Sequence, residues 1–166
     1  LKADCPLEFD VEHLRYGAYL HDLGKLAVPD HILLKPGKLT PQEFEQMKEH
    51  SSKGFEMARR VSGLAPEVLH IISHHHERWD GAGYPDRLAA ETIPLLARVF
   101  SICDVYDALL SKRVYKQPWT KDEAVAEIRA QQGRQFDPVI AGAFLDTVVS
   151  NVSSVITEWQ YEANGK

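Results

Sequence analysis

The 166-residue sequence predicts a single all-α domain. Apolar residues recur at three- and four-residue spacing in several windows, which is the periodicity of a helix with one buried face. Two Thr-x-x-Glu capping boxes stand at the start of such windows and indicate where helices begin. No segment shows the apolar and polar alternation of a half-buried strand. These observations favour a bundle of helices joined by short loops.

Three helices are predicted in the N-terminal half. The first runs from Asp10 to Lys25, and the Pro- and Gly-rich loop VPDHILLKPGKL follows it. The second begins at the capping box of Thr40, with proline at its first helical position. The third begins at Pro66 and runs through His76. A Gly-rich loop, ERWDGAGYPDRL, then separates this half from the next.

The C-terminal half also consists of predicted helices. A strongly apolar helix opens at Pro94, and the basic connector SKRVYKQPW leads from it to the second capping box at Thr120. A last long helix begins at Pro138 and runs past Val149. We expect one domain over residues 1–150, and the end of this helix with a tail over 151–166.

Composition disfavours several classes of protein. The net charge of −5 argues against a surface that follows the phosphates of a nucleic-acid polymer by charge alone. No run approaches the roughly 18 apolar residues that cross a bilayer, so we expect no membrane contact in this segment. Cys5 and Cys103 form no C-x-x-C motif, which argues against a disulfide framework. A cytoplasmic location fits best.

Ionisable side chains continue the apolar faces of four predicted helices. An unpaired charge inside a protein is expensive, so these groups require pairing or a metal ion. A single inward histidine is more often a hydrogen-bonded core residue than a ligand, but here imidazoles and carboxylates occur together. That mixture suits Fe, Mn, Zn or Ni rather than Ca. The predicted metal ligands are His21, Asp22, His50, His75, His76 and Asp104.

The predicted ligands suit phosphoryl chemistry. Two metal ions favour in-line displacement at phosphorus. Asp22 can bridge two ions because its two oxygens have separate lone pairs. Lys25 shares a helical face with His21 and can stabilise a transition state, or it is an exposed last-turn lysine. Asp22 and Lys25 are therefore our candidate catalytic residues.

Cations and aromatic residues near this site have two interpretations. Lys112, Arg113 and Lys116 follow the apolar helix and can contact phosphate, or they form a solvated basic loop. Trp79 and Tyr84 in the Gly-rich loop can stack on a base, while Trp79 can equally fill the core.

Several of these segments resemble one known family. HDLGK at 21–25 is similar to the HDxGK motif of the HD phosphohydrolase superfamily. HHERWDGAGYP at 75–85 resembles the HHExxDGxGYP stretch of its HD-GYP branch. The segments LLKPGKLTPQEFEQMKEH, ARVFSICDVYDALLSKRVYK and QFDP also follow that branch. The similarity covers roughly residues 10 to 145.

The resemblance implies a metal-dependent hydrolase that opens cyclic di-GMP to pGpG, and in some members on to GMP, as the output domain of bacterial signal transduction. It implies two or three divalent metals, with iron or manganese favoured and zinc or nickel as alternatives. All of the predicted ligands match ligands of the family, with Asp22 bridging, and Lys25 matches the lysine beside the metals. Tyr84, Arg113 and Lys116 match residues that meet the dinucleotide. The GYP loop is implied as a contact for a diguanylate cyclase domain.

The chain departs from the family pattern in two places. The family has a further histidine, and in some members a glutamate, on a helix upstream of HDxGK; only 20 residues precede His21, and His13 lies on the same predicted helix. The first helix or helices are therefore expected to be missing from this sequence. Ala82 replaces a common serine, and PDRLAAETIP lacks the usual glycines, which we interpret as minor.

Two alternative functions remain open. The site can act on a different substrate, such as a mixed cyclic dinucleotide or a nucleotide monophosphate ester. A catalytically weak or inactive module that binds a cyclic dinucleotide or a diguanylate cyclase domain is the alternative from a different class, and a missing upstream helix favours it.

Overall fold

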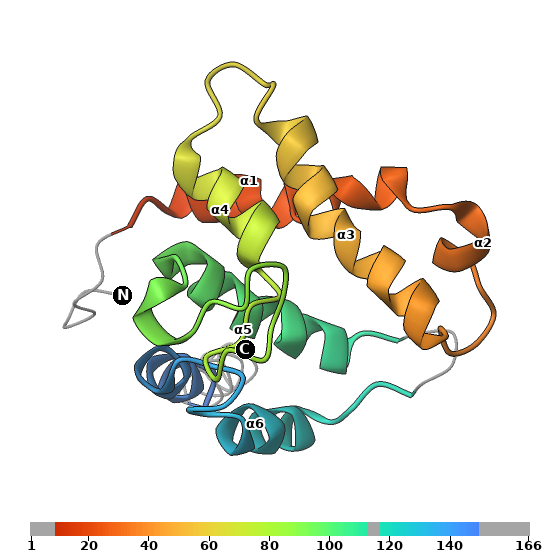
Figure 1. The fold of residues 1–166 in the computed structure, drawn as a ribbon. Helices are drawn as coiled ribbons and strands as arrows, with labels where there is room; N and C mark the ends of the chain where they lie inside the picture. The colour runs from red at the N-terminus through yellow and green to blue at the C-terminus, as the bar shows by residue number, and fades with distance from the viewer. Residues whose placement is uncertain (1–8, 113–116, 150–166) are drawn as a thin grey trace, which may run out of the picture.

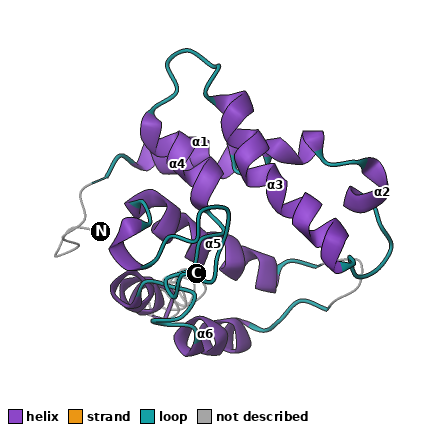
Figure 2. Cartoon of the chain, in the orientation of Figure 1, coloured by secondary structure: helices purple, strands orange, loops and turns teal. Residues whose placement is uncertain are grey.

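The computed structural model describes residues 9–112 and 117–149, and these residues are helical with no strand. The all-α prediction is confirmed (Figure 2). The helices are α1 (Val11–Leu20), α2 (Asp30–Leu33), α3 (Pro41–Ala58), α4 (Pro66–His74), α5 (Leu95–Leu110), α6 (Lys121–Ala130) and a further helix over 138–149. Two short 3-10 helices, η1 (Leu23–Ala27) and η2 (Ala90–Thr92), lie between them.

Helix α4 occupies the centre of one half of the molecule. It packs against α1, α3 and α5, while α6 and the helix over 138–149 lie on the other side of α5 (Figure 1). Its two isoleucines face different neighbours: Ile71 packs with Phe100 of α5, and Ile72 packs with Ala58 of α3. A helix that is apolar on several sides is buried on several sides. The C-terminal end of α4 therefore lies deep inside the domain.

Helix α1 ends earlier than predicted. The expected helix from Asp10 to Lys25 is wrong beyond Leu20, because His21 and Asp22 form a turn that leads into η1. The reason lies in the contact between η1 and α3. A Cβ at Gly24 would collide with the carbonyl oxygen of His50 and lie 2.5 Å from the amide nitrogen of Gly54. The two backbones touch, and η1 reaches α3 only because the chain bends after Leu20.

Other boundaries agree with the sequence or differ by a turn. Thr40 and Thr120 each form a complete capping box, as predicted. Helix α4 ends at His74 rather than His76. The predicted loop after η1 contains the one-turn helix α2, which buries Ile32.

In the described part of the chain, no helix has the length and apolar character needed to cross a bilayer. The predicted segment 151–166 lies outside the described residues.

The loop over residues 77–89, which we call the GYP loop, is tied to the segment ahead of the last helix. The amides of Trp79 and Asp80 donate to the carbonyls of Gln135 and Arg134 at 3.1 and 2.8 Å. The guanidinium of Arg98 lies over the Trp79 ring, 6.0 Å from its centroid. The Trp79 ring therefore packs against Arg98 of α5.

Candidate metal centre

The chain brings imidazoles and carboxylates from four segments to one place. The turn after α1, helix α3, the residues after α4 and helix α5 each contribute to it. The contributing residues are those predicted as ligands: His21, Asp22, His50, His75, His76 and Asp104. Among them, His50, His75 and His76 each offer a ligand atom within 4.8 Å of the others.

Asp22 lies between the imidazoles of His21 and His50. Its Oδ1 is 3.6 Å from Nε2 of His50, and its Oδ2 is 3.3 Å from Nε2 of His21. Nε2 of His21 is in turn 3.9 Å from Oδ1 of Asp104. Because each oxygen of Asp22 faces a different imidazole, this carboxylate has the placement needed to bridge two cations.

Hydrogen bonds to the backbone orient the imidazoles. Nδ1 of His21, His50 and His75 faces the carbonyl three residues earlier in the chain, at 2.8, 2.7 and 3.1 Å. A carbonyl only accepts, so each Nδ1 carries a proton, and in the neutral ring Nε2 then offers a lone pair. This arrangement is typical of histidines that bind metal through Nε2.

The distance between two of these nitrogens fits a cation. Nε2 of His50 and Nε2 of His75 are 3.4 Å apart. With both protons on Nδ1, two lone pairs point into one small space, an arrangement that becomes favourable when a cation binds there. The donor set of neutral imidazoles and carboxylates therefore fits divalent transition metals.

Burial keeps the deepest imidazoles neutral. Burial, with the neighbouring His76 as a smaller cause, lowers the pKa of His75 to about 2. Burial, followed by the effect of His50, lowers the pKa of His76 to about 3. Neutral imidazole is the form that binds metal, so these rings need not lose a proton near neutral pH.

The outer part of the cluster carries charge. Burial opposes ionisation of Asp22, but hydrogen bonds from His21 and Lys25 outweigh it and hold the pKa of this carboxyl well below its usual range. Burial also opposes protonation of His21, yet hydrogen bonding to Asp22 leaves the pKa of His21 raised. Nζ of Lys25 lies 2.6 Å from Oδ2 of Asp22. Lys25 is on η1 rather than on α1, and it still lies beside the cluster, as predicted.

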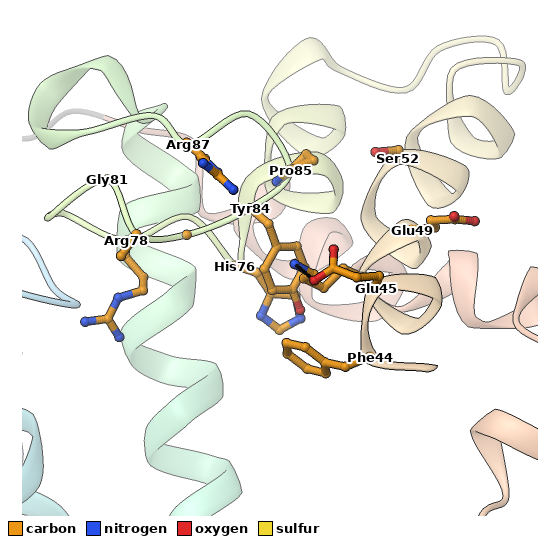
Figure 3. Close-up of a pocket in the computed structure, with 13 residues that line it drawn as sticks. Phe44, Glu45, Glu49, Ser52, His76, Arg78, Gly81, Tyr84, Pro85 and Arg87 are labelled. Atoms are coloured by element: carbon orange, nitrogen blue, oxygen red, sulfur yellow. Dashed lines mark ion pairs between the residues drawn. The ribbon is translucent and has the colours of Figure 1, made fainter. Parts of the chain in front are cut away.

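A pocket of about 660 Å³ adjoins this cluster between α3 and the GYP loop (Figure 3). His76 and Tyr84 line its inner end, with their ring centroids 4.8 Å apart. Burial raises the pKa of the Tyr84 phenol, so the hydroxyl keeps its proton. Phe44 from α3 lies across from Tyr84 with its side chain 48% exposed. Tyr84 thus faces the pocket, as expected, whereas Trp79 does not line it.

Asp107 lies one turn after Asp104 on α5 and is not brought to the cluster. It is exposed and accepts a hydrogen bond from Ser111. The predicted dinucleotide contacts Arg113 and Lys116 lie outside the described residues.

One buried residue of the loop was not identified from the sequence. Glu77 is only 3% exposed, and its Oε1 accepts from the amide of Asp86 at 2.7 Å. A Cβ at Gly83 would lie 2.5 Å from the Cα of Glu77, so the GYP loop folds tightly over this residue. Its position directly after the two histidines was the available signal. Burial raises the pKa of the Glu77 carboxyl.

The helical fold and the cluster of imidazoles and carboxylates agree with one known protein family. A family model described as "HD domain" matches residues 6–140. The chain belongs to the HD domain family, in its HD-GYP branch.

Relatives with assigned names agree with this placement. The chain is 49% identical over 139 residues to "Cyclic di-GMP phosphodiesterase response regulator RpfG" of Xanthomonas campestris, covering 83% of this chain and 37% of that protein. It is 43% identical over 140 residues to "3'3'-cGAMP-specific phosphodiesterase 2" of Vibrio cholerae, covering 84% of this chain and 27% of that protein. The chain thus spans less than two fifths of the length of these relatives.

A solved structure has the same fold. The crystal structure of the cyclic GMP-AMP specific phosphodiesterase V-cGAP3 of V. cholerae aligns with a TM-score of 0.62 at 20% identity. The alignment covers 85% of this chain and 38% of that one.

Proposed function

We propose that this domain is a metal-dependent phosphodiesterase that opens a cyclic dinucleotide, with cyclic di-GMP as substrate and pGpG, and further GMP, as products. The observation that carries the proposal is the position of Asp22 between the imidazoles of His21 and His50, beside a pocket. The names of the relatives support the choice of substrate class, since they are phosphodiesterases for cyclic di-GMP or 3'3'-cGAMP.

The proposed ligands divide into two groups that share Asp22. His50, His75 and His76 would hold one ion, and His21 with Asp104 would hold the second. Iron or manganese is our choice of metal, and a third ion is compatible with the family. When bound, two such ions supply the charge neutralisation and water activation that in-line displacement at phosphorus requires.

The protein's own residues position and polarise the substrate. The ammonium group of Lys25 lies next to Asp22, where negative charge would develop on the phosphate during displacement. Tyr84 covers one side of His76 and presents a protonated hydroxyl toward the pocket. Arg113 and Lys116 are proposed to contact the dinucleotide, as the resemblance implies. We also infer a cytoplasmic setting, and a contact between the GYP loop and a diguanylate cyclase domain.

Turnover of purified protein tests the proposal. The chain is loaded with Mn²⁺ or Fe²⁺ and incubated with cyclic di-GMP or 3'3'-cGAMP, and the products are separated by chromatography. We expect pGpG to accumulate from cyclic di-GMP. The enzyme proposal would be contradicted if the chain held two metals and bound cyclic di-GMP saturably but formed no product. That result would favour the non-catalytic binding module.

A further inference from the structure

The pocket beside the proposed metal centre is lined by cationic residues from two elements. Helix α3 contributes Lys48. The GYP loop contributes Arg87 (Figure 3). Its volume of about 660 Å³ lies inside the range of about 300–1,000 Å³ that is typical of small-molecule sites. The pocket therefore has room for much more than the phosphate held at the metal cluster.

The two cations differ in how their charges are balanced. Nζ of Lys48 is paired with Glu45 at 2.7 Å and lies 5.7 Å from the centroid of the Tyr84 ring. Arg87 is exposed, and within the described residues its guanidinium takes part in no ion pair or side-chain hydrogen bond. Arg78, on the same loop, is by contrast paired with Asp80 at 2.8 Å.

Arg87 also has an unfavourable backbone conformation. Its φ is 55°, and Ala90 three residues later has a φ of 50°. A side chain with a Cβ is disfavoured in this left-handed region, which glycine adopts freely. Arg87 thus lines the pocket in a strained conformation, and such strain is typical of functional positions.

We propose that Arg87, assisted by Lys48, binds the phosphate of the cyclic dinucleotide that is not cleaved. The inference rests on the proposed function. A cyclic dinucleotide carries two phosphodiester anions, and when one lies at the metal cluster the other projects into the adjoining pocket. A guanidinium can hold a phosphate through two parallel hydrogen bonds. The exposed ring of Phe44 and the ring of Tyr84 offer surfaces on which a base can stack.

Steady-state kinetics of the metal-loaded full chain with cyclic di-GMP test this role. Arg87→Gly should raise KM about tenfold or more, the scale of losing a charge-assisted contact, while kcat falls by much less than KM rises. The same variant should melt about 2–4 °C higher or more, because glycine relieves the left-handed strain. Arg87→Lys should recover part of the lost affinity through its charge. The KM of the wild type should rise more steeply with salt than that of Arg87→Gly.

Ala90→Gly is the matched control, since Ala90 has the same backbone conformation and does not line the pocket. It should raise the melting temperature without changing KM. Lys53→Met, one turn and a half along α3 from Lys48, should also leave KM unchanged. If Arg87→Gly and Ala90→Gly have the same KM, the inference about Arg87 is overturned, whereas the proposed function is unaffected. Absence of turnover in the metal-loaded wild type overturns both.

Discussion

Asp22 is the residue on which the proposed metal centre depends. It is contacted by Lys25 at 2.6 Å and His21 at 3.3 Å from its own segment, and by His50 of α3 at 3.6 Å. A carboxylate among these groups balances positive charge that would otherwise accumulate in a half-buried space. Its removal should therefore affect both metal binding and the orientation of its neighbours.

Asp22→Ala should lose metal and activity together. The effect on kcat/KM should exceed about 100-fold, since even residues that only orient metal ligands account for about 10–100-fold. Metal content is measured by elemental analysis of the purified variant. Asp107→Ala is the control, because this exposed aspartate lies one turn from Asp104 on α5 and bonds only Ser111 among the described side chains. Unchanged metal content in Asp22→Ala would show that the ligand assignment is wrong.

Gly24 is a position where one methyl group should matter. Gly24→Ala places a Cβ against the backbone of α3 at His50, where neither helix can yield without moving a ligand. We expect a loss of about 1–3 kcal/mol or more in the free energy of unfolding. Denaturant titration measures it. Gly142→Ala is the control: its nearest neighbour would be 3.8 Å away, in a helix, so it should stabilise by about 0.5–1 kcal/mol. Equal effects of the two variants would refute the close-contact explanation.

At the scale of elements, the GYP loop depends on the start of the last helix. Arg98 of α5 donates to Oδ2 of Asp137 at 2.7 Å, and Asp137 is 5% exposed. Oδ1 of the same carboxylate accepts from the amide of Val139 at 2.8 Å and so caps the helix. One side chain therefore joins α5, the last helix and the segment that holds the loop.

Asp137→Ala should strongly destabilise the protein. It leaves the charge of Arg98 without its partner in a buried place, for which about 3–5 kcal/mol is expected. Thermal or chemical unfolding measures the loss. Glu56→Ala breaks an exposed pair with Arg59 at 2.8 Å and should change stability by less than about 1 kcal/mol. A loss of similar size in both variants would argue against the joining role of Asp137.

Across the whole molecule, metal binding should link four separate segments of the chain. The proposed ligands come from α3, α5 and the segments after α1 and α4. A metal that binds only the folded state stabilises it by mass action, by about 2.7 kcal/mol at 100 times Kd. Chelation should therefore loosen the domain as a unit.

Removal of metal by a chelator should lower the melting temperature by about 5–10 °C, given about 2–4 °C per kcal/mol for a domain of this size. Adding Mn²⁺ back should restore it, as followed by differential scanning fluorimetry. Asp22→Ala should show no such response. If neither chelator nor Mn²⁺ changed the melting temperature of the wild type, the proposal that a metal links these segments would be contradicted.

The sequence predicts those candidate site residues that belong to a pattern within one helix, and misses those that matter only through contacts distant in sequence. His50 and His75 were found because each continues an apolar face of its own helix, which is a local pattern. Phe44 and Arg87 were not predicted as site residues, because both are exposed and no local pattern marks either as a ligand-binding residue. Their importance arises only when α3 and the GYP loop lie side by side.

The all-α class, the capped starts of α3 and α6, and the choice of candidate ligands follow from the sequence alone. These depend on the period of a helix and on contacts within a few residues. Three features follow only from the tertiary structure: where α1 ends, how Asp22 comes to lie between His21 and His50, and that Arg87 lines the pocket in a left-handed conformation. Each of these depends on segments distant in sequence that meet only because α4 packs among α1, α3 and α5.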